Sequence, residues 1–239
     1  IRGRARSFDQ TQPYAMWQDL LRNWLGTRMD EPKEKTRDRL LRQTEALWGA
    51  GMAEYYPDFA RFLGLPLEPD FAEQIEHLDA ESLRQRLFLA IRSWLEALAR
   101  QAPVIVTFSD MHWADATSLE LLKYCLPVCD YLSLLWLAVF RPDRRSRAWE
   151  FRHHVETEYP HRLVAVHLDP LTAEESQTLI EQMIGEDVLP EDAADTIVQK
   201  AEGNPFFIEE LVRSLIANGS LVRETISPGQ EPPKERWRA

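Results

Sequence analysis

The sequence has few cysteines, no long hydrophobic run and a deficit of basic residues, and each shortage excludes a class of protein. Only two of the 239 residues are cysteine, which excludes a fold held together by many disulfides. No apolar run approaches the roughly 20 residues that span a bilayer, so no transmembrane helix is expected. The 28 Lys and Arg residues face 39 Asp and Glu residues, which gives a net charge of -11. This acidity argues against non-specific binding to nucleic acids or to anionic membranes.

The composition is otherwise that of an ordinary globular protein. Hydrophobic residues make up 44% of the chain and charged residues 28%, and the length allows one or two compact domains. The chain starts at Ile1 without a methionine or a signal peptide, which predicts a segment of a longer protein. Cys125 and Cys129 lie four residues apart without further soft ligands nearby, so we interpret them as buried thiols.

Hydrophobic periodicity predicts an α/β part up to residue 169, a helical part over 170–224 and a tail over 225–239. The α/β part should contain a short strand near 1–6 and apolar strands over 104–108, 132–140 and 162–168. Its helices are expected over 12–24, 31–47, 79–100, 119–126 and 144–158. Alternating helices and apolar strands are typical of an open parallel sheet.

Helices alone are expected after residue 170, over 172–184, 190–201 and 204–217. Thr172 followed by Glu175 is a capping-box pattern that begins the first of them. The proline-rich stretch 225–234 is interpreted as a loop, either a tail or the start of a following winged-helix-like segment.

One apolar strand ends at an acidic residue in a way that suits a binding site. Val104–Phe108 is followed by Ser109 and Asp110. The carboxyl ends of parallel strands border the crevice in which open α/β sheets bind ligands. A carboxylate at this position can hold Mg²⁺ through water opposite nucleotide phosphates. The alternative is that Asp110 only caps the turn that follows.

The residues after this strand carry a family resemblance. The run Asp110-Met111-His112-Trp113-Ala114-Asp115 with its Ser-Leu helix resembles the extended Walker B region of the STAND branch of AAA+-like P-loop ATPases. The match is to the modules fused to class III adenylate/guanylate cyclases, to LuxR-type regulators or to Ser/Thr kinases. Leu134–Pro142 resembles the family's sensor strand, and Ala201–Leu211 resembles its lid-domain motif.

The resemblance implies a P-loop NTPase-like parallel sheet followed by an all-helical lid domain, with ATP and Mg²⁺ held between them. It implies that Asp110 is the catalytic acidic residue and holds Mg²⁺ through water. The implied nucleotide-binding residues are Arg141, Gly203, Asn204 and Pro205. The implied residues that flank Asp110 in the Walker B region are Ser109, His112, Trp113 and Asp115.

Each implied role has a structural alternative. Arg141 could simply pair with a carboxylate. Gly203, Asn204 and Pro205 could form only a helix start, since Asn and Pro suit the first positions of a helix. His112 and Trp113 could be packing residues that orient the loop after the strand.

Two departures from the family pattern bear on function. Ser109 stands where the family has Glu or Asp, and serine cannot replace a carboxylate as a base or as a charge on Mg²⁺. Whether Ser109 or Asp110 faces the metal stays open at this point, but slow hydrolysis is expected in either case. No lysine follows a glycine, so the loop Gly-x-x-x-x-Gly-Lys-Ser/Thr is absent.

We expect that loop and its strand upstream of Ile1. The sheet should therefore lack its P-loop strand between 134–140 and 162–168, and unpaired strand edges should make the fragment aggregate.

The resemblance implies an ATP-binding, ATPase-type switch module of a multidomain signalling or transcription regulator, which we expect in the cytoplasm. The parent protein is expected to be a P-loop ATPase, whereas this fragment alone should not hydrolyse ATP. The expected partners are nucleotide, effector and sensor domains of the same chain and a second copy in a homo-oligomer, with no membrane and no direct nucleic-acid contact. The alternative is a degenerate, non-hydrolysing interaction scaffold of the same fold. A generic hydrolase lacks support, because neither Gly-x-Ser-x-Gly nor His-Glu-x-x-His occurs.

Overall fold

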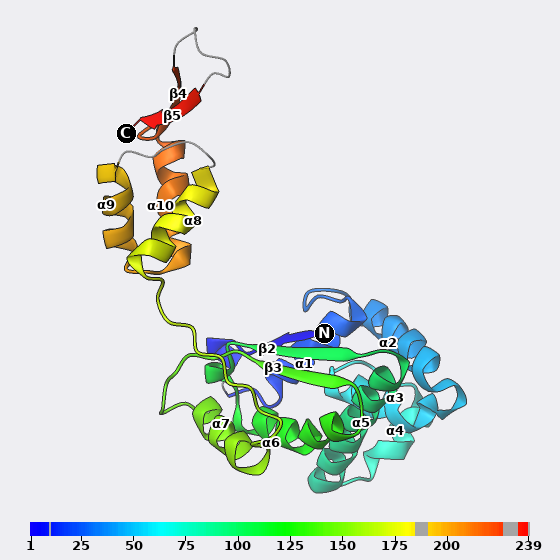
Figure 1. Ribbon diagram of the computed structural model, residues 1–239. Helices are drawn as coiled ribbons and strands as arrows, with labels where there is room; N and C mark the ends of the chain where they lie inside the picture. Colours follow the sequence, from blue (N-terminus) through cyan, green and yellow to red (C-terminus); the bar gives the residue numbers. More distant parts are fainter. Residues whose placement is uncertain (10, 185–190, 227–233, 239) are drawn as a thin grey trace. The chain divides into compact units, whose positions relative to one another are not determined.

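The computed structural model describes residues 1–9, 11–184, 191–226 and 234–238. The chain divides into two compact units, a first unit of Ile1–Leu163 and a second unit of Val164–Ala239 (Figure 1). No helix in the described part of the chain has the length and apolarity needed to cross a bilayer.

The first unit is rich in helices and contains one small sheet. Its elements in chain order are β1 (Arg2–Arg4), α1 (Ala15–Leu25), α2 (Lys33–Trp48), α3 (Met52–Phe62), α4 (Pro69–Glu76), α5 (Ala80–Gln101), β2 (Val104–Ser109), α6 (Ala116–Cys125), β3 (Leu134–Ala138) and α7 (Arg147–Glu158). These bounds confirm each helix that periodicity predicts in this part of the chain. Cys125 is fully buried and Cys129 is partly buried, and both thiols are free.

The sheet consists of three parallel strands in the order β1-β2-β3. Arg4 is the register partner of Ser109, and Thr107 lies between Arg2 and Leu137. The predicted parallel sheet is therefore confirmed for these strands, and the carboxyl ends of β1 and β2 lie side by side. Any residue that follows β2 is consequently close to the end of β1.

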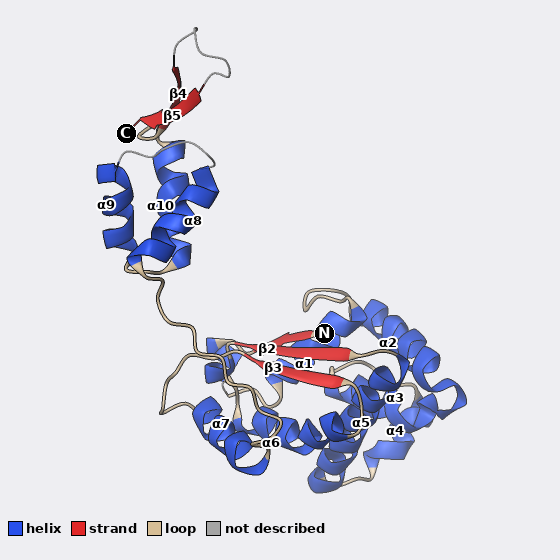
Figure 2. Ribbon diagram, viewed as in Figure 1, coloured by secondary structure: helices blue, strands red, loops and turns tan. Residues whose placement is uncertain are grey.

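The two faces of this sheet differ sharply in burial. Val106 and Phe108 point to a face that is covered by helices, and both are at most 1% exposed. Figure 2 shows α1, α5 and α6 on one side of the strands. Alternate residues point to the other side, where Ile105 and Leu135 are exposed by 54% and 57%. We call this side the open face; its residues are Arg2, Arg4, Ile105, Thr107, Ser109, Leu135 and Leu137.

The strand expected over 162–168 is wrong. These residues form no strand, and Val164, Val166 and Leu168 are exposed by 84%, 77% and 91%. The alternating apolar pattern is present, but a strand also needs a neighbour that accepts its backbone hydrogen bonds. Within the described residues, β3 has no partner strand on the edge away from β2.

The second unit contains a three-helix cluster and a hairpin. Its helices are α8 (Ala173–Ile184), α9 (Glu191–Ala201) and α10 (Pro205–Ala217). Their shared core is made by Ile180, Ile184, Ile197, Ile208 and Val212, among others. Thr172 and Glu175 form the predicted capping box, because each side chain accepts a hydrogen bond from the backbone N–H of the other.

The second unit contains strands as well as helices, and the first strand begins inside the part that the sequence predicts to be helical, 170–224. β4 (Val222–Ile226) and β5 (Lys234–Arg238) pair as antiparallel strands. The predicted loop over 225–234 is therefore wrong at its two ends, where cross-strand pairing overrides the loop signal. Its middle, residues 227–233, lies outside the described residues.

The open face should drive self-association of the 239-residue chain. Replacing Leu135 and Leu137 together by Thr is expected to lower the apparent mass in light scattering at high protein concentration, because exposed apolar strands associate. The matched control is Val106→Thr on the covered face. It should leave association unchanged but lower the free energy of unfolding by about 1–3 kcal/mol, since it buries a hydroxyl. Equal association of the double variant and the unaltered chain would contradict the role of the open face.

Candidate functional site

The candidate site lies where β2 ends and the chain turns into a short 3-10 helix over 111–113. Asp110 connects the two in the left-handed conformation, with φ 56° and ψ 31°. Asp and Asn adopt this conformation more readily than other non-glycine residues. The turn is tied to the continuation of β3, because Met111 N–H donates to the Val139 carbonyl at 3.1 Å and Val139 N–H donates to the Phe108 carbonyl at 2.9 Å.

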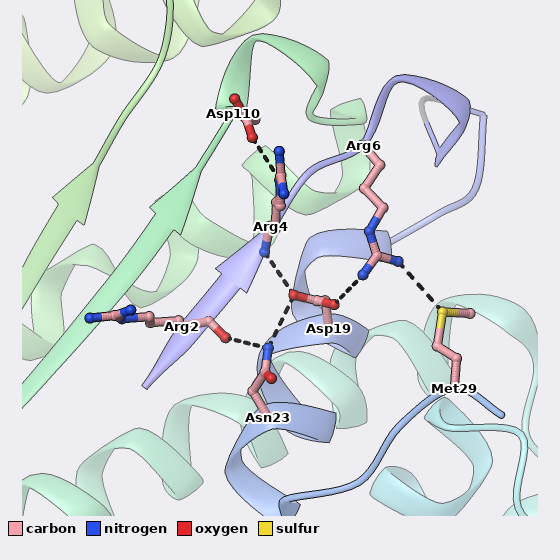
Figure 3. A network of polar contacts seen from close by, with 7 residues as sticks. All are labelled: Arg2, Arg4, Arg6, Asp19, Asn23, Met29 and Asp110. Carbon is pink, nitrogen blue, oxygen red and sulfur yellow. Dashed lines mark hydrogen bonds and ion pairs between the residues drawn. The ribbon is translucent and has the colours of Figure 1, made fainter. Parts of the chain in front are cut away.

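Asp110 pairs with a residue that sequence reasoning missed. Arg4 Nε donates to Asp110 Oδ2 at 2.7 Å (Figure 3). The side chain of Asp110 is 34% exposed and that of Arg4 is 64% exposed. Arg4 and Asp110 are 106 residues apart in sequence, and only the register of β1 on β2 brings them together. A cluster of arginines at the start of the chain was the single signal that could have pointed to this pair.

The backbone around Arg4 is fixed by α1. Arg4 N–H donates to Asp19 Oδ2 at 3.0 Å, and the other oxygen of Asp19 accepts from Arg6 at 3.0 Å. Asn23 donates to the Arg2 carbonyl at 3.0 Å and to Asp19 at 3.2 Å (Figure 3). Helix α1 therefore holds the outer edge of β1 through two polar side chains, one turn apart.

His112 is close to two charged residues that the sequence assigns to the site. Burial lowers the pKa of its ring, and the nearby positive charge of Arg141 lowers it further. Asp110 and Asp143 act in the opposite direction. Both ring nitrogens are buried and have no hydrogen-bond partner among the residues that the structure describes. Asp110 follows β2 directly and Arg141 follows the end of β3 by three residues, and the charges of both act on the ring of His112.

A cavity of about 460 Å³ opens beside this group. It is lined by His112, Trp113, Asp143, Arg145, Ser146, Arg147 and Glu150, with Ala114. Trp113 is 37% exposed, and its ring centroid lies 4.8 Å from that of His112. Trp113 is thus not a core residue. Its ring packs against His112, which is consistent with a role in orienting the loop after β2.

Asp115 has a structural role at the start of α6. Its carboxylate is 6% exposed and accepts hydrogen bonds from Ser118 N–H at 2.8 Å and from Tyr14 N–H at 3.1 Å. The hydroxyls of Thr117 and Ser118 also donate to it, each at 2.5 Å. Both oxygens of Asp115 are thus engaged in capping α6 and in tying the start of α1 to α6, and the residue is buried.

Gly203, Asn204 and Pro205 lie in the second unit, at the start of α10. Asn204 caps the helix by accepting from Phe206 N–H at 3.1 Å, and Pro205 is its first residue. Gly203 has φ 74°, and its carbonyl accepts from Leu171 N–H at 2.8 Å. The helix-start alternative therefore describes these residues correctly, while their proximity to a nucleotide stays a prediction.

The residues of the site fit a Mg²⁺ ion that arrives with phosphates rather than one held by the protein alone. Within the described residues, no group of three His, Cys, Asp or Glu side chains could hold a metal ion. Asp110 offers one partly exposed carboxylate, and its Oδ1 has no hydrogen-bond partner among the described residues. Mg²⁺ is commonly bound by one or two carboxylates together with substrate phosphates and water.

Comparison with known proteins is consistent with this geometry. The family model described as AAA ATPase domain matches residues 1–137, which is more than half of the chain. The chain therefore belongs to the AAA ATPase domain family. Membership indicates a nucleotide-binding, ATPase-type function and accounts for the α/β fold of the first unit. A second model, described as a domain of unknown function, matches residues 172–222.

One curated relative is an uncharacterised protein of Rhizobium meliloti (strain 1021). It is 29% identical over 143 residues, which cover 59% of this chain and 13% of the relative. The chain thus spans only a small part of the length of that protein. No solved structure matches the chain significantly.

Replacing Asp115 should destabilise the first unit without touching the ligand side of the site. Asp115→Ala leaves buried donors on α6 and at Tyr14 unpaired, so the free energy of unfolding in urea should fall by about 2–3 kcal/mol. The matched control is Asp79→Ala, which removes the exposed cap of α5, a bond from Ser82 N–H at 2.8 Å. Water can replace that bond, so its effect should be clearly smaller. Equal effects would show that burial of the Asp115 cap is unimportant.

Gly203→Ala should destabilise the second unit more than Gly219→Ala. Both glycines have positive φ, 74° and 75°, so an added side chain is strained at either position. A Cβ at Gly219 meets nothing within 4 Å, whereas one at Gly203 collides with the Leu171 carbonyl and with Pro170. We expect losses of about 1 kcal/mol at Gly219 and about 3 kcal/mol at Gly203, measured by urea unfolding. Similar losses at both positions would contradict the packing of Gly203 on the segment before α8.

Proposed function

We propose that the first unit binds ATP together with Mg²⁺ at the carboxyl ends of β2 and β3, as part of a nucleotide-dependent switch. The observation that carries the proposal is the grouping of Asp110, His112 and Arg141 at these strand ends, in the part of the chain that matches the AAA ATPase domain. Ligands in open parallel sheets bind at this end. A carboxylate for the metal and an arginine for phosphate are the two charges that such a ligand requires.

Each residue of the proposed site has a role that its position permits. Bound Mg²⁺ would neutralise phosphate charge, and Asp110 would orient one of its water ligands through the unpartnered Oδ1. Arg141 is exposed and has no ion-pair partner among the described residues, so its guanidinium is free for a phosphate. Burial favours the neutral form of His112, in which one ring nitrogen would donate a hydrogen bond and the other would accept one.

We further propose that the second unit is the lid over the nucleotide. The cluster of α8, α9 and α10 has a core of its own and is compact without the first unit. Gly203 packs on the segment that leads into α8, so a contact between nucleotide and Gly203-Asn204-Pro205 could be transmitted to the whole cluster. The STAND-type setting, with effector and sensor domains in the same chain and a possible homo-oligomer, is part of this proposal.

The second candidate is a non-hydrolysing scaffold of the same fold. Ser109 favours it, because this residue supplies no carboxylate, and Asp110 is already paired with Arg4. In that case the site would hold no nucleotide. The two candidates separate by ATP binding and by turnover: the switch binds ATP in a Mg²⁺-dependent way even if hydrolysis is slow, whereas the scaffold does not.

Replacing Asp110 should weaken binding of Mg²⁺–ATP but not of metal-free ATP. The 239 residues contain no Gly-x-x-x-x-Gly-Lys-Ser/Thr loop, so the natural full-length protein is used. Titration with a fluorescent ATP analogue should give about ten-fold weaker binding for Asp110→Asn in the presence of Mg²⁺. In the presence of EDTA, the variant and the unaltered protein should bind equally.

The matched control is Glu120→Gln, which removes an exposed carboxylate from the middle of α6. Its ATP affinity should equal that of the unaltered protein under both conditions. Unchanged Mg²⁺–ATP affinity in Asp110→Asn would overturn the role of Asp110, and absence of ATP binding by the unaltered protein would favour the scaffold.

A further inference from the structure

Asp110 already has a counter-charge from the neighbouring strand. Arg4 Nε donates to Asp110 Oδ2 at 2.7 Å, a short, charge-assisted hydrogen bond (Figure 3). The other carboxylate oxygen, Oδ1, has no hydrogen-bond partner in the part of the chain that the structure describes. One side of the carboxylate is therefore occupied by a cation, and the other side is open to a ligand.

Arg4 is fixed at its backbone and exposed at its guanidinium. Its N–H is held by Asp19 at 3.0 Å, and Asn23 holds the carbonyl of Arg2 two residues earlier. The side chain, in contrast, is 64% exposed, and its only ion pair with a described residue is the one with Asp110. A long side chain anchored in this way can leave the carboxylate by a change of rotamer, without any change in the pairing of β1 with β2.

Because Ser109 supplies no carboxylate, the ion pair of Arg4 with Asp110 has a large effect on the charge that Mg²⁺ would meet. Ser109 is the register partner of Arg4, so a carboxylate at this position would lie beside the arginine and share its charge. With a hydroxyl in its place, Asp110 is the one carboxylate at the end of β2. If Arg4 and Mg²⁺ both remained beside Asp110, the two cations would compete for a single carboxylate and repel each other.

We propose that Arg4 is a positioning residue that competes with Mg²⁺ for Asp110. Without metal, Arg4 holds the carboxylate at the end of β2; when Mg²⁺ arrives with nucleotide, the Arg4 side chain leaves Asp110 and extends into solvent. The inference rests on the proposed function, because it needs Mg²⁺–nucleotide at this carboxylate. It also gives the ion pair a consequence: the concentration of Mg²⁺ needed for nucleotide binding is set partly by an arginine of β1.

The test measures Mg²⁺ dependence rather than activity. Mg²⁺ is titrated into the full-length protein at a fixed concentration of a fluorescent ATP analogue, and the half-saturating Mg²⁺ concentration is read from the nucleotide signal. For Arg4→Gln we expect this concentration to fall about two- to five-fold, the range of an exposed ion pair. Arg4→Lys keeps the charge and should stay close to the unaltered protein. Nucleotide binding in EDTA should be the same for all three proteins.

Arg2→Gln is the matched control. Arg2 lies on the same strand and the same face, and its side chain has no ion-pair partner among the described residues. It should leave the half-saturating Mg²⁺ concentration unchanged. Thermal melts should show that the Arg4 variants remain folded, since the side chain is mostly exposed.

The outcomes separate the two proposals. If Arg4→Gln binds nucleotide normally but needs the same or more Mg²⁺, or if Arg2→Gln shifts the titration equally, competition at Asp110 is overturned and the proposed function stands. If the unaltered protein shows no Mg²⁺-dependent nucleotide binding, the proposed function fails and this inference fails with it.

Discussion

The first unit depends on the packing of aromatic side chains beneath one face of its sheet. The rings of Trp17 and Phe108 lie 5.1 Å apart between centroids, and Trp136 stacks on Phe108 at 6.4 Å. Gly3 permits this arrangement, because a Cβ there would collide with Phe108 and with the Met16 carbonyl. Since side chains alternate along a strand, burying Gly3 and Phe108 forces Arg4 and its neighbours to the open face. The polar network at the site is therefore a consequence of how the core packs.

Local patterns were sufficient wherever an element is stabilised by its own sequence. The 22 residues of α5 follow an apolar stripe and an Asp79 cap, and the apolar run of β2 is bounded by Pro103. The segment over 162–168 carries the same kind of apolar signal and still forms no strand. A strand must also pair with a neighbouring strand, and this segment does not pair with β3. The hairpin of β4 and β5 is the converse case, in which pairing produces strands where the local sequence predicts a loop.

The site residues also divide into those that local sequence indicates and those that depend on strand pairing. Asp110 and Arg141 could be found from their positions after apolar strands, and the structure places both near His112. Asp115 directly precedes α6, the position of a helix cap, and Ser118 N–H donates to its carboxylate. The arginines at the start of the chain are visible in the sequence, but the pairing of Arg4 with Asp110 depends on strand register, which no pattern in a three-residue strand reveals. Ser109 departs visibly from the family motif, but the consequence of this departure for the charge balance at Asp110 becomes clear only from its position beside Arg4.

The backbone at Asp110 restricts which residues can serve at the end of β2. Its φ of 56° lies in a region where a long or branched side chain is strained by about 1–2 kcal/mol, while Asp, Asn and Gly are tolerated. A glutamate, although equally charged, would meet this strain and would also carry its carboxylate further from the turn. Substitution by Asn or Gly is therefore tolerated best at this position. A related protein that did not bind metal could carry either residue, and it would keep the fold and lose only the negative charge. The backbone conformation of the turn thus restricts which residues can replace Asp110, independently of any selection for catalysis.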